Sequence, residues 1–283
     1  MEAVMDLKQI LIDWVSMSIL ERKTLIAEQG DELLFNMLQE IGAVDAELRD
    51  QLIYRTFMEM LGEQLLSHEQ MQYLYKEIVS EKYLFFQIGD EQTDTVLTRS
   101  FSALLLTGIL TTDAELRFLP DEALTTYLEK SGHYLQKERD VRGFIDGKGW
   151  AHSIAHGADL AAATVRHPAF ELRMAPPILQ AIKACLWKNA VYIDDEEERL
   201  IIVIEEMMKK GVSEEVFVEW AEQVFDKLDH HLYSIGYDPS YFKARTCTLH
   251  FMKTLYFALK IKKSMPKLEG VVYMQIAKHF KLG

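Results

Sequence analysis

Apolar residues recur every three to four positions along nearly the whole of this 283-residue chain. The segment DELLFNMLQEIG, residues 31–42, places its large apolar side chains on one helical face, and residues 213–232, SEEVFVEWAEQVFDKLDHHL, repeat the pattern. A period of 3.6 residues is that of an amphipathic helix, whereas a half-buried strand alternates with a period of two. Alternating segments are rare and short, so the sequence predicts an all-α fold.

A weak internal repeat organises these predicted helices. An aspartate or serine is followed five residues later by an arginine at four places: Asp50 and Arg55, Asp94 and Arg99, Asp194 and Arg199, Ser240 and Arg245. Gly147 and His152 occupy the same slots in the long gap between the second and third copies. Another helical stretch separates successive copies, which gives a helix-pair unit in the size range of HEAT and armadillo repeats. The alternative is coincidence, because aspartate and serine begin many helices.

The repeat predicts a right-handed superhelix of antiparallel helix pairs, HEAT-like or armadillo-like. In this arrangement the aspartate would cap the first turn of each inner helix. The arginine would reach an acid on the neighbouring repeat. Glycine and proline are scarce, at 14 and 6 residues, and no linker interrupts the pattern, so residues 1–283 are expected to form a single helical domain.

Charge and composition narrow the classes of partner and compartment. A formal net charge of −13 opposes the binding of a phosphate backbone, so no nucleic-acid role is expected. The longest apolar run, Phe101 to Leu110, is shorter than the ~20 residues that span a bilayer, which predicts no membrane span. The N-terminus lacks the features of a signal peptide, and Cys185 and Cys247 lie in helical apolar patterns typical of reduced thiols. A cytoplasmic protein is therefore expected.

One segment departs from the helical pattern. In GKGW, residues 147–150, two glycines flank Lys148 immediately before Trp150. A helix that starts here would offer free backbone N–H groups, the positive end of its dipole and a lysine to an anion. The alternative is a structural turn, since the spacing is not that of a phosphate-binding P-loop.

Two histidines and an acid follow on the helix predicted to begin at Trp150. His152, His156 and Asp159 stand at i, i+4 and i+7, on one narrow face. Imidazoles one turn apart can chelate a divalent metal, but Ser153 replaces the glutamate of the HExxH zinc-protease motif. Three interpretations stay open: packing at a helix interface, a pocket for a small molecule or anion, and a site for a divalent metal. No other cofactor is expected.

Charged residues just upstream, Glu138 to Arg142, are typical of a salt-bridged helix end, although Arg142 is also a candidate ligand-binding residue. The favoured function is a binding or interaction protein whose concave face takes a protein or a small anionic ligand. The candidate residues of that face and its ligand site are Arg99, Arg142, Lys148, Trp150, His152, His156, Asp159, Arg199 and Arg245. The alternative is an enzyme in which His152 or His156 is the general acid or base and an arginine or Lys148 holds an anionic substrate.

The central segment also resembles a known family. ERDVRGFIDGKGWAHSIAHGADL, residues 138–160, is similar to the signature of the bacterial DUF2785 proteins, and KGWAHSIAHGAD is its most recognisable part. EEERL at residues 196–200 and KAR at residues 243–245 resemble further landmarks of that family. The resemblance implies a helical bacterial protein without an assigned activity, and it assigns no role to any residue.

Overall fold

A computed structural model describes residues 7–280 of the chain. Over this range the predicted all-α fold is confirmed, since the only strands are a two-residue pair. The α-helices are α1 (Leu7–Ser16), α2 (Ile19–Gln39), α3 (Arg55–Gly62), α4 (His68–Ile78), α5 (Thr95–Leu116), α6 (Asp121–Lys137), α7 (Ser153–Arg166), α8 (Ala175–Cys185), α9 (Glu196–Lys209), α10 (Glu214–Ser234), α11 (Pro239–Lys262) and α12 (Pro266–His279). A π-helical stretch, η1 (Glu47–Tyr54), leads into α3, and a short 3-10 turn, η2 (Leu172–Met174), leads into α8.

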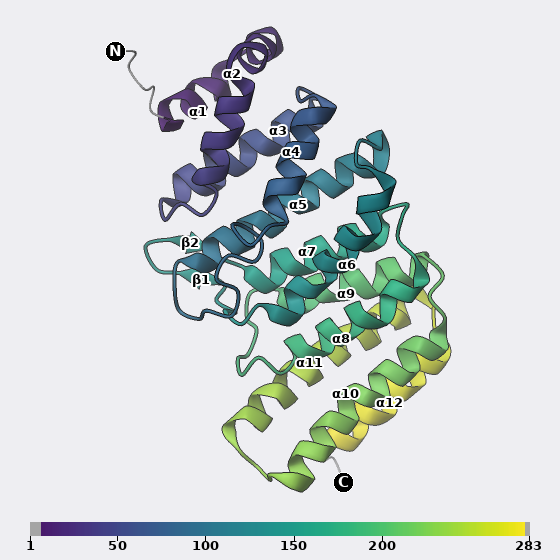
Figure 1. The fold of residues 1–283 in the computed structure, drawn as a ribbon. Helices are drawn as coiled ribbons and strands as arrows, with labels where there is room; N and C mark the ends of the chain where they lie inside the picture. The colour runs from purple at the N-terminus through teal and green to yellow at the C-terminus, as the bar shows by residue number, and fades with distance from the viewer. Residues whose placement is uncertain (1–6, 281–283) are drawn as a thin grey trace.

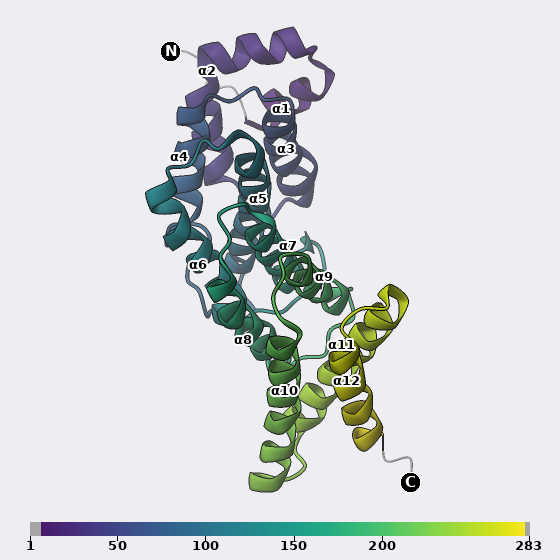
Figure 2. The ribbon, with the colours of Figure 1, turned by 90° about the vertical axis from the view of Figure 1, so that its right-hand side faces the viewer.

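The helices lie in two layers that run from the N-terminal to the C-terminal end of the molecule (Figure 1). In one layer α3 packs on α5, α5 on α7, α7 on α9 and α9 on α11. In the other, α6 packs on α8, α8 on α10 and α10 on α12. Figure 2 shows α4, α6, α8 and α10 on one side and α5, α7, α9 and α11 on the other. Consecutive helices therefore alternate between the layers.

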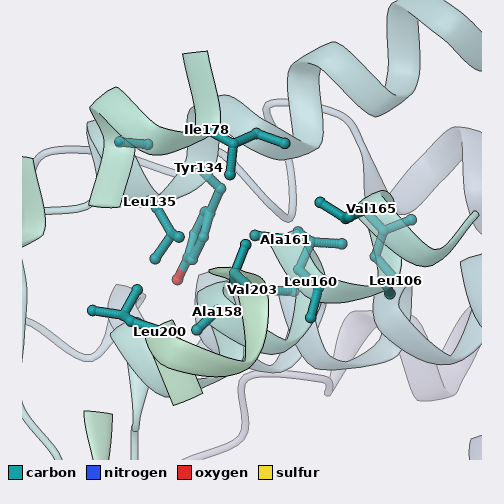
Figure 3. Packing of buried hydrophobic residues seen from close by; sticks show 14 of the residues in the cluster. Leu106, Tyr134, Leu135, Ala158, Leu160, Ala161, Val165, Ile178, Leu200 and Val203 are labelled. Carbon is teal, nitrogen blue, oxygen red and sulfur yellow. The ribbon is translucent and has the colours of Figure 1, made fainter. Parts of the chain in front are cut away.

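Helix α7 lies at the centre of the stack and is built for close packing. Its buried face is largely alanine, and Figure 3 shows Ala158 and Ala161 among larger side chains from α6, α8 and α9. Gly157 takes the closest approach, because an added Cβ would come within 2.7 Å of Leu135 and 2.8 Å of Tyr134. Small residues on α7 thus let helices of both layers pack closely against it.

The helix caps differ from those that the repeat predicts. Ser67 forms a capping box with Gln70 at the start of α4. The aspartates of the repeat do not cap helices in the predicted way: Asp50 lies inside η1, and Asp94 begins α5 without a side-chain cap bond. At α11 the cap is Asp238 rather than Ser240. The prediction of a shared aspartate cap is therefore wrong.

The four repeat arginines all lie in the layer of α3, α5, α9 and α11, but their surroundings differ. Arg55 is half exposed and pairs with Glu59 of its own helix. Arg199 reaches across to Asp159 of α7, the kind of contact that the repeat predicts. Arg245 donates to the carbonyl oxygen of His279. The expected row of charge pairs between neighbouring repeats therefore occurs at one of these three positions.

Arg99 does not lie on an open face, and that prediction is wrong. Its side chain is fully buried and forms two hydrogen bonds to Glu138, of 2.6 and 2.9 Å. Its remaining N–H groups bond to Thr95 and to backbone carbonyls of the loop before α5, including that of Phe86. Arg99 thus fastens α5 to the end of α6 and to the loop that precedes α5.

Helix α5 is also the one helix among residues 7–280 that is long and apolar enough to cross a membrane by length and composition. Of its most apolar window, 61% is buried inside the protein. It packs against α3, α4 and α7. Its apolar character is accounted for by its position between neighbouring helices.

Candidate functional site

The segment between α6 and α7 forms a small β-hairpin, where the sequence predicts a helix from Trp150. Strands β1 (Phe144–Ile145) and β2 (Gly149–Trp150) pair antiparallel, with Phe144 opposite Trp150. The turn requires positive φ at Gly147 and Gly149, +74° and +79°, which glycine adopts without a Cβ clash. Helix α7 begins only at Ser153, so the predicted helix boundary is wrong by three residues.

This hairpin removes Lys148 from the predicted anion site. Lys148 lies in the hairpin turn rather than at a helix start, and its Nζ is 2.5 Å from Oδ1 of Asp94. Its backbone N–H bonds to the carbonyl of Ile145 within the turn. The combination of free helix N–H groups and a lysine that was expected to hold an anion is therefore not formed at residues 147–149.

A buried arginine that the sequence analysis did not single out fastens the hairpin to the N-terminal helices. Arg49 of η1 donates to the carbonyl oxygens of Ala43, at 2.7 Å, and of Lys148, at 2.8 Å, with a longer contact of 3.4 Å to Trp150. Its guanidinium lies 4.7 Å from the centre of the Phe101 ring. Burial is the main cause that lowers the pKa of Arg49. The hairpin thus has a fixed position against η1 and α5.

The upstream half of the segment, residues 138–142, is a network of buried polar groups. Glu138 and Asp140 are almost inaccessible, and Glu138 also accepts backbone N–H bonds from Arg139 and Asp140. Arg142 donates hydrogen bonds to both carboxylate oxygens of Asp140 and, at 2.5 Å, to the carbonyl oxygen of Thr93. These contacts agree with a salt-bridged helix end, and they commit Arg142 to Asp140 of its own loop and to the loop before α5.

Aromatic rings gather around the start of α7. The indole of Trp150 stacks on the imidazole of His152, with centres 4.1 Å apart and planes inclined by 29°. His156 meets His152 edge to face at 5.9 Å and Phe101 at 5.5 Å. His152 sits at the helix start with φ +48° and leaves its buried Nε2 without a hydrogen-bond partner. The two histidines are brought together, as their spacing predicts.

Both imidazoles are held in the neutral form. Burial is the main cause that lowers the pKa of His156 to about 3, and Nδ1 of His156 lies 2.8 Å from the hydroxyl of Ser100. Burial also lowers the pKa of His152. Ser100 and His156 have the pairing of a nucleophile and its base, but Ser100 is fully buried and also contacts the carbonyl of Ala151. Because Ser100 is fully buried and His156 is neutral, this serine–histidine pair is better suited to packing in a wall of the fold than to proton transfer near pH 7.

Asp159 lies one turn further along α7 and is held by Arg199. Both carboxylate oxygens accept from Nη1 of Arg199 at 2.9 Å. Burial raises the pKa of Asp159, and Arg199 opposes that rise. Nowhere among residues 7–280 do three histidine, cysteine, aspartate or glutamate side chains gather in a way that would hold a metal ion. The metal interpretation of His152, His156 and Asp159 therefore lacks its set of ligands in the part of the chain that is described.

An open groove of about 660 Å³ runs past these rings. One wall comes from η1 and α3, and the other from α5, the hairpin and the start of α7. Its lining residues are Asp50, Gln51, Tyr54, Arg55, Met58, Glu59, Phe101, Leu104, Trp150, His152 and His156. Of the predicted site residues, Trp150, His152 and His156 line the groove, whereas Lys148, Arg142, Asp159 and Arg199 do not.

The wall from η1 is the part of the site that sequence reasoning missed. Asp50 and Arg55 stood out only as repeat markers, and Tyr54 not at all. A π-helical stretch has a widened turn and recurs at functional sites, but its hydrogen-bond shift leaves no signal in an apolar pattern. Phe101 is named from the sequence only as the first residue of the apolar run that ends at Leu110. What the sequence could not reveal is that η1, about a hundred residues before the hairpin, lies beside it.

The fold and this groove define an all-helical, two-layered protein with an aromatic site at its central hairpin. Residues 84–257 match the family model described as a protein of unknown function, DUF2785, and the chain belongs to that family. The matched range includes the hairpin and α7 but not η1. No curated protein and no solved structure matches the chain.

Proposed function

We propose that this chain is a binding protein and that the groove between η1 and the central hairpin is its ligand-binding surface. The observation that carries the proposal is the exposure of Trp150, 41%, in a groove whose Phe101 and His156 rings are held by contacts with Arg49 and Ser100. A fixed aromatic wall binds at low entropic cost, because few side chains must be ordered on association. A volume of about 660 Å³ is within the ~300–1,000 Å³ range of ligand sites.

The alternation of helices between two layers favours the finer architecture expected from the repeat, a HEAT-like α–α superhelix formed by the whole chain as one domain. Proteins of this architecture commonly bind along the surface of one layer. Two buried free cysteines favour a reducing compartment, in agreement with the bacterial cytoplasm. These statements support a binding role by architecture, and the groove supplies the specific surface.

An enzyme is the less favoured function. A general base works best with a pKa near the operating pH, and His156, with a pKa of about 3, lies far from neutrality. Lys148, which was to hold an anionic substrate, is paired with Asp94 outside the groove. Among the lining residues, no other pair is better placed to act as a base and a nucleophile.

Site-directed disulfide trapping tests the binding role even while the ligand is unidentified. Gln51 lies exposed on the groove wall, and Gln51→Cys would trap thiol fragments that bind beside it. Suitable probes are three small thiols that end in a phenyl, a guanidinium and a carboxylate group. Cys185 and Cys247 are buried, and burial raises the pKa of Cys185 to about 11, so the native thiols react slowly.

Glu222→Cys provides the matched control, because Glu222 is exposed on α10 and lines no part of the groove. Intact-mass measurement should show at least one of the three fragments enriched at position 51 over position 222. Adding Trp150→Ala should remove that enrichment. Equal labelling at both cysteines with every fragment would contradict the proposed binding role.

A further inference from the structure

Aromatic rings line the groove, and the structure already contains a guanidinium against one of them. Arg49 is fully buried and lies 4.7 Å from the Phe101 ring centre. Tyr54 meets Phe101 edge to face at 6.3 Å, and Trp150 lines the same groove with 41% of its surface exposed. Aromatic faces attract cations through the ring quadrupole, most strongly that of tryptophan. The cluster is therefore suited to a second planar cation on its open side.

The charges around the groove favour a cation over an anion. Asp50 lines the groove with its side chain 24% exposed, and its Oδ1 lies 2.8 Å from Nε of Arg49 but is not aligned for a hydrogen bond. Burial raises the pKa of Asp50 by more than its ion pair with Arg49 lowers it, which disfavours the carboxylate. A further cation would stabilise it. Arg49 offers no matching benefit to an anion, because it is fully buried behind the wall.

The remaining charged groups do not reverse this preference. Arg55 lines the groove, but its Nε is bound to Oε1 of Glu59 at 2.7 Å. The two histidines are neutral and do not repel a cation, while Lys148 pairs with Asp94 elsewhere. The net charge of −13 also draws cations toward the protein over a longer range.

We propose that the groove binds an arginine side chain of a partner polypeptide, with its guanidinium against the rings of Tyr54 and Trp150 and beside the carboxylate of Asp50. The groove is open along its length, which fits a side chain presented on a longer chain better than an enclosed small molecule. This inference rests on the binding role proposed above and specifies its ligand chemistry. It reverses the small anionic ligand expected from the sequence.

Three capped tetrapeptides, Ac-Gly-X-X-Gly-NH2 with X arginine, citrulline or glutamate, test the inference. Citrulline has nearly the shape of arginine without its charge. Titration followed through the indole N–H resonance of Trp150 should give a dissociation constant about tenfold lower for the arginine peptide than for the citrulline peptide. Asp50→Asn should weaken the arginine peptide about fivefold and leave the citrulline peptide unchanged.

Lys148→Gln is the control, because it removes a positive charge near the groove without touching its lining. It should leave the arginine affinity unchanged, and thermal melts should show that both variants fold. Equal affinity for arginine and citrulline, tighter binding of glutamate, or no binding of any peptide would overturn the inference. The trapping experiment at position 51 decides the binding role separately, since enrichment of the phenyl or carboxylate fragment would sustain that role while the arginine ligand fails.

Discussion

The connection from α6 into the start of α7 has two halves, residues 138–142 and residues 150–156, with opposite surroundings. In residues 138–142 the carboxylates of Glu138 and Asp140 are enclosed and saturated with hydrogen bonds. Residues 150–156 reach a groove, where Trp150 is 41% exposed. Saturated polar groups stabilise a fold, whereas exposed rings remain able to contact a ligand. We infer that the first half maintains the fold and the second half binds.

The largest expected effect breaks the buried pair of the first half. Glu138→Gln leaves the guanidinium of Arg99 buried without its carboxylate partner. Removal of one member of a buried ion pair typically costs about 3–5 kcal/mol. Chemical denaturation should show a loss of unfolding free energy of that size.

Arg199→Gln is the matched comparison, since it breaks the Asp159 pair, whose arginine side chain is 48% exposed. Water and salt screen such a pair, so the expected loss is about 1 kcal/mol or less. Similar losses in the two variants would contradict the division between an enclosed and an open half.

The pH dependence of stability should show that His156 is neutral in the fold. Its pKa is about 3 in the folded protein, below the ordinary value of 6.5 expected after unfolding. Below pH 6.5 the unfolded chain therefore takes up a proton that the folded protein does not, and stability falls as the pH approaches 3. Between pH 7 and 4.5 this residue should account for a loss of roughly 2.5 kcal/mol.

His156→Asn removes that titration and keeps an oxygen able to bond to Ser100. Urea denaturation of both proteins at pH 7 and pH 4.5 measures the difference. The variant should lose less stability than the wild type on acidification. An identical loss in the two proteins would mean that His156 titrates normally in the fold.

Alanine substitutions at the two hairpin glycines should differ by a smaller amount in their effect on the unfolding free energy. An added Cβ at Gly149 would lie 3.0 Å from Cβ of Ala46 and 3.3 Å from the guanidinium of Arg49. At Gly147 nothing lies within 4 Å. Both positions have positive φ, which costs about 1 kcal/mol or more for alanine. Gly149→Ala should therefore lower the unfolding free energy by about 1 kcal/mol more than Gly147→Ala, and a smaller loss at Gly149 would show that η1 does not clamp the hairpin.

The sequence predicts the helices well because their apolar faces are local and periodic. It also predicts the hairpin segment as the unusual feature and brings His152 and His156 together through their four-residue spacing. It fails at Trp150, where glycines with positive φ form a hairpin rather than a helix start. Contacts across long separations are beyond a local pattern, and Arg49 bonds to Lys148 from 99 residues away. This contact holds η1 beside the hairpin, where η1 forms one wall of the groove.

The central claim is that Trp150 serves binding rather than stability, and one pair of measurements on Trp150→Ala tests it. Trp150 is partly exposed, so its loss should lower the unfolding free energy by about 1–2 kcal/mol, well below the loss in Glu138→Gln. The same variant should lose fragment trapping at position 51. Unchanged trapping together with a loss of stability as large as that of Glu138→Gln would show that the rings at the start of α7 only pack, and the account would be wrong.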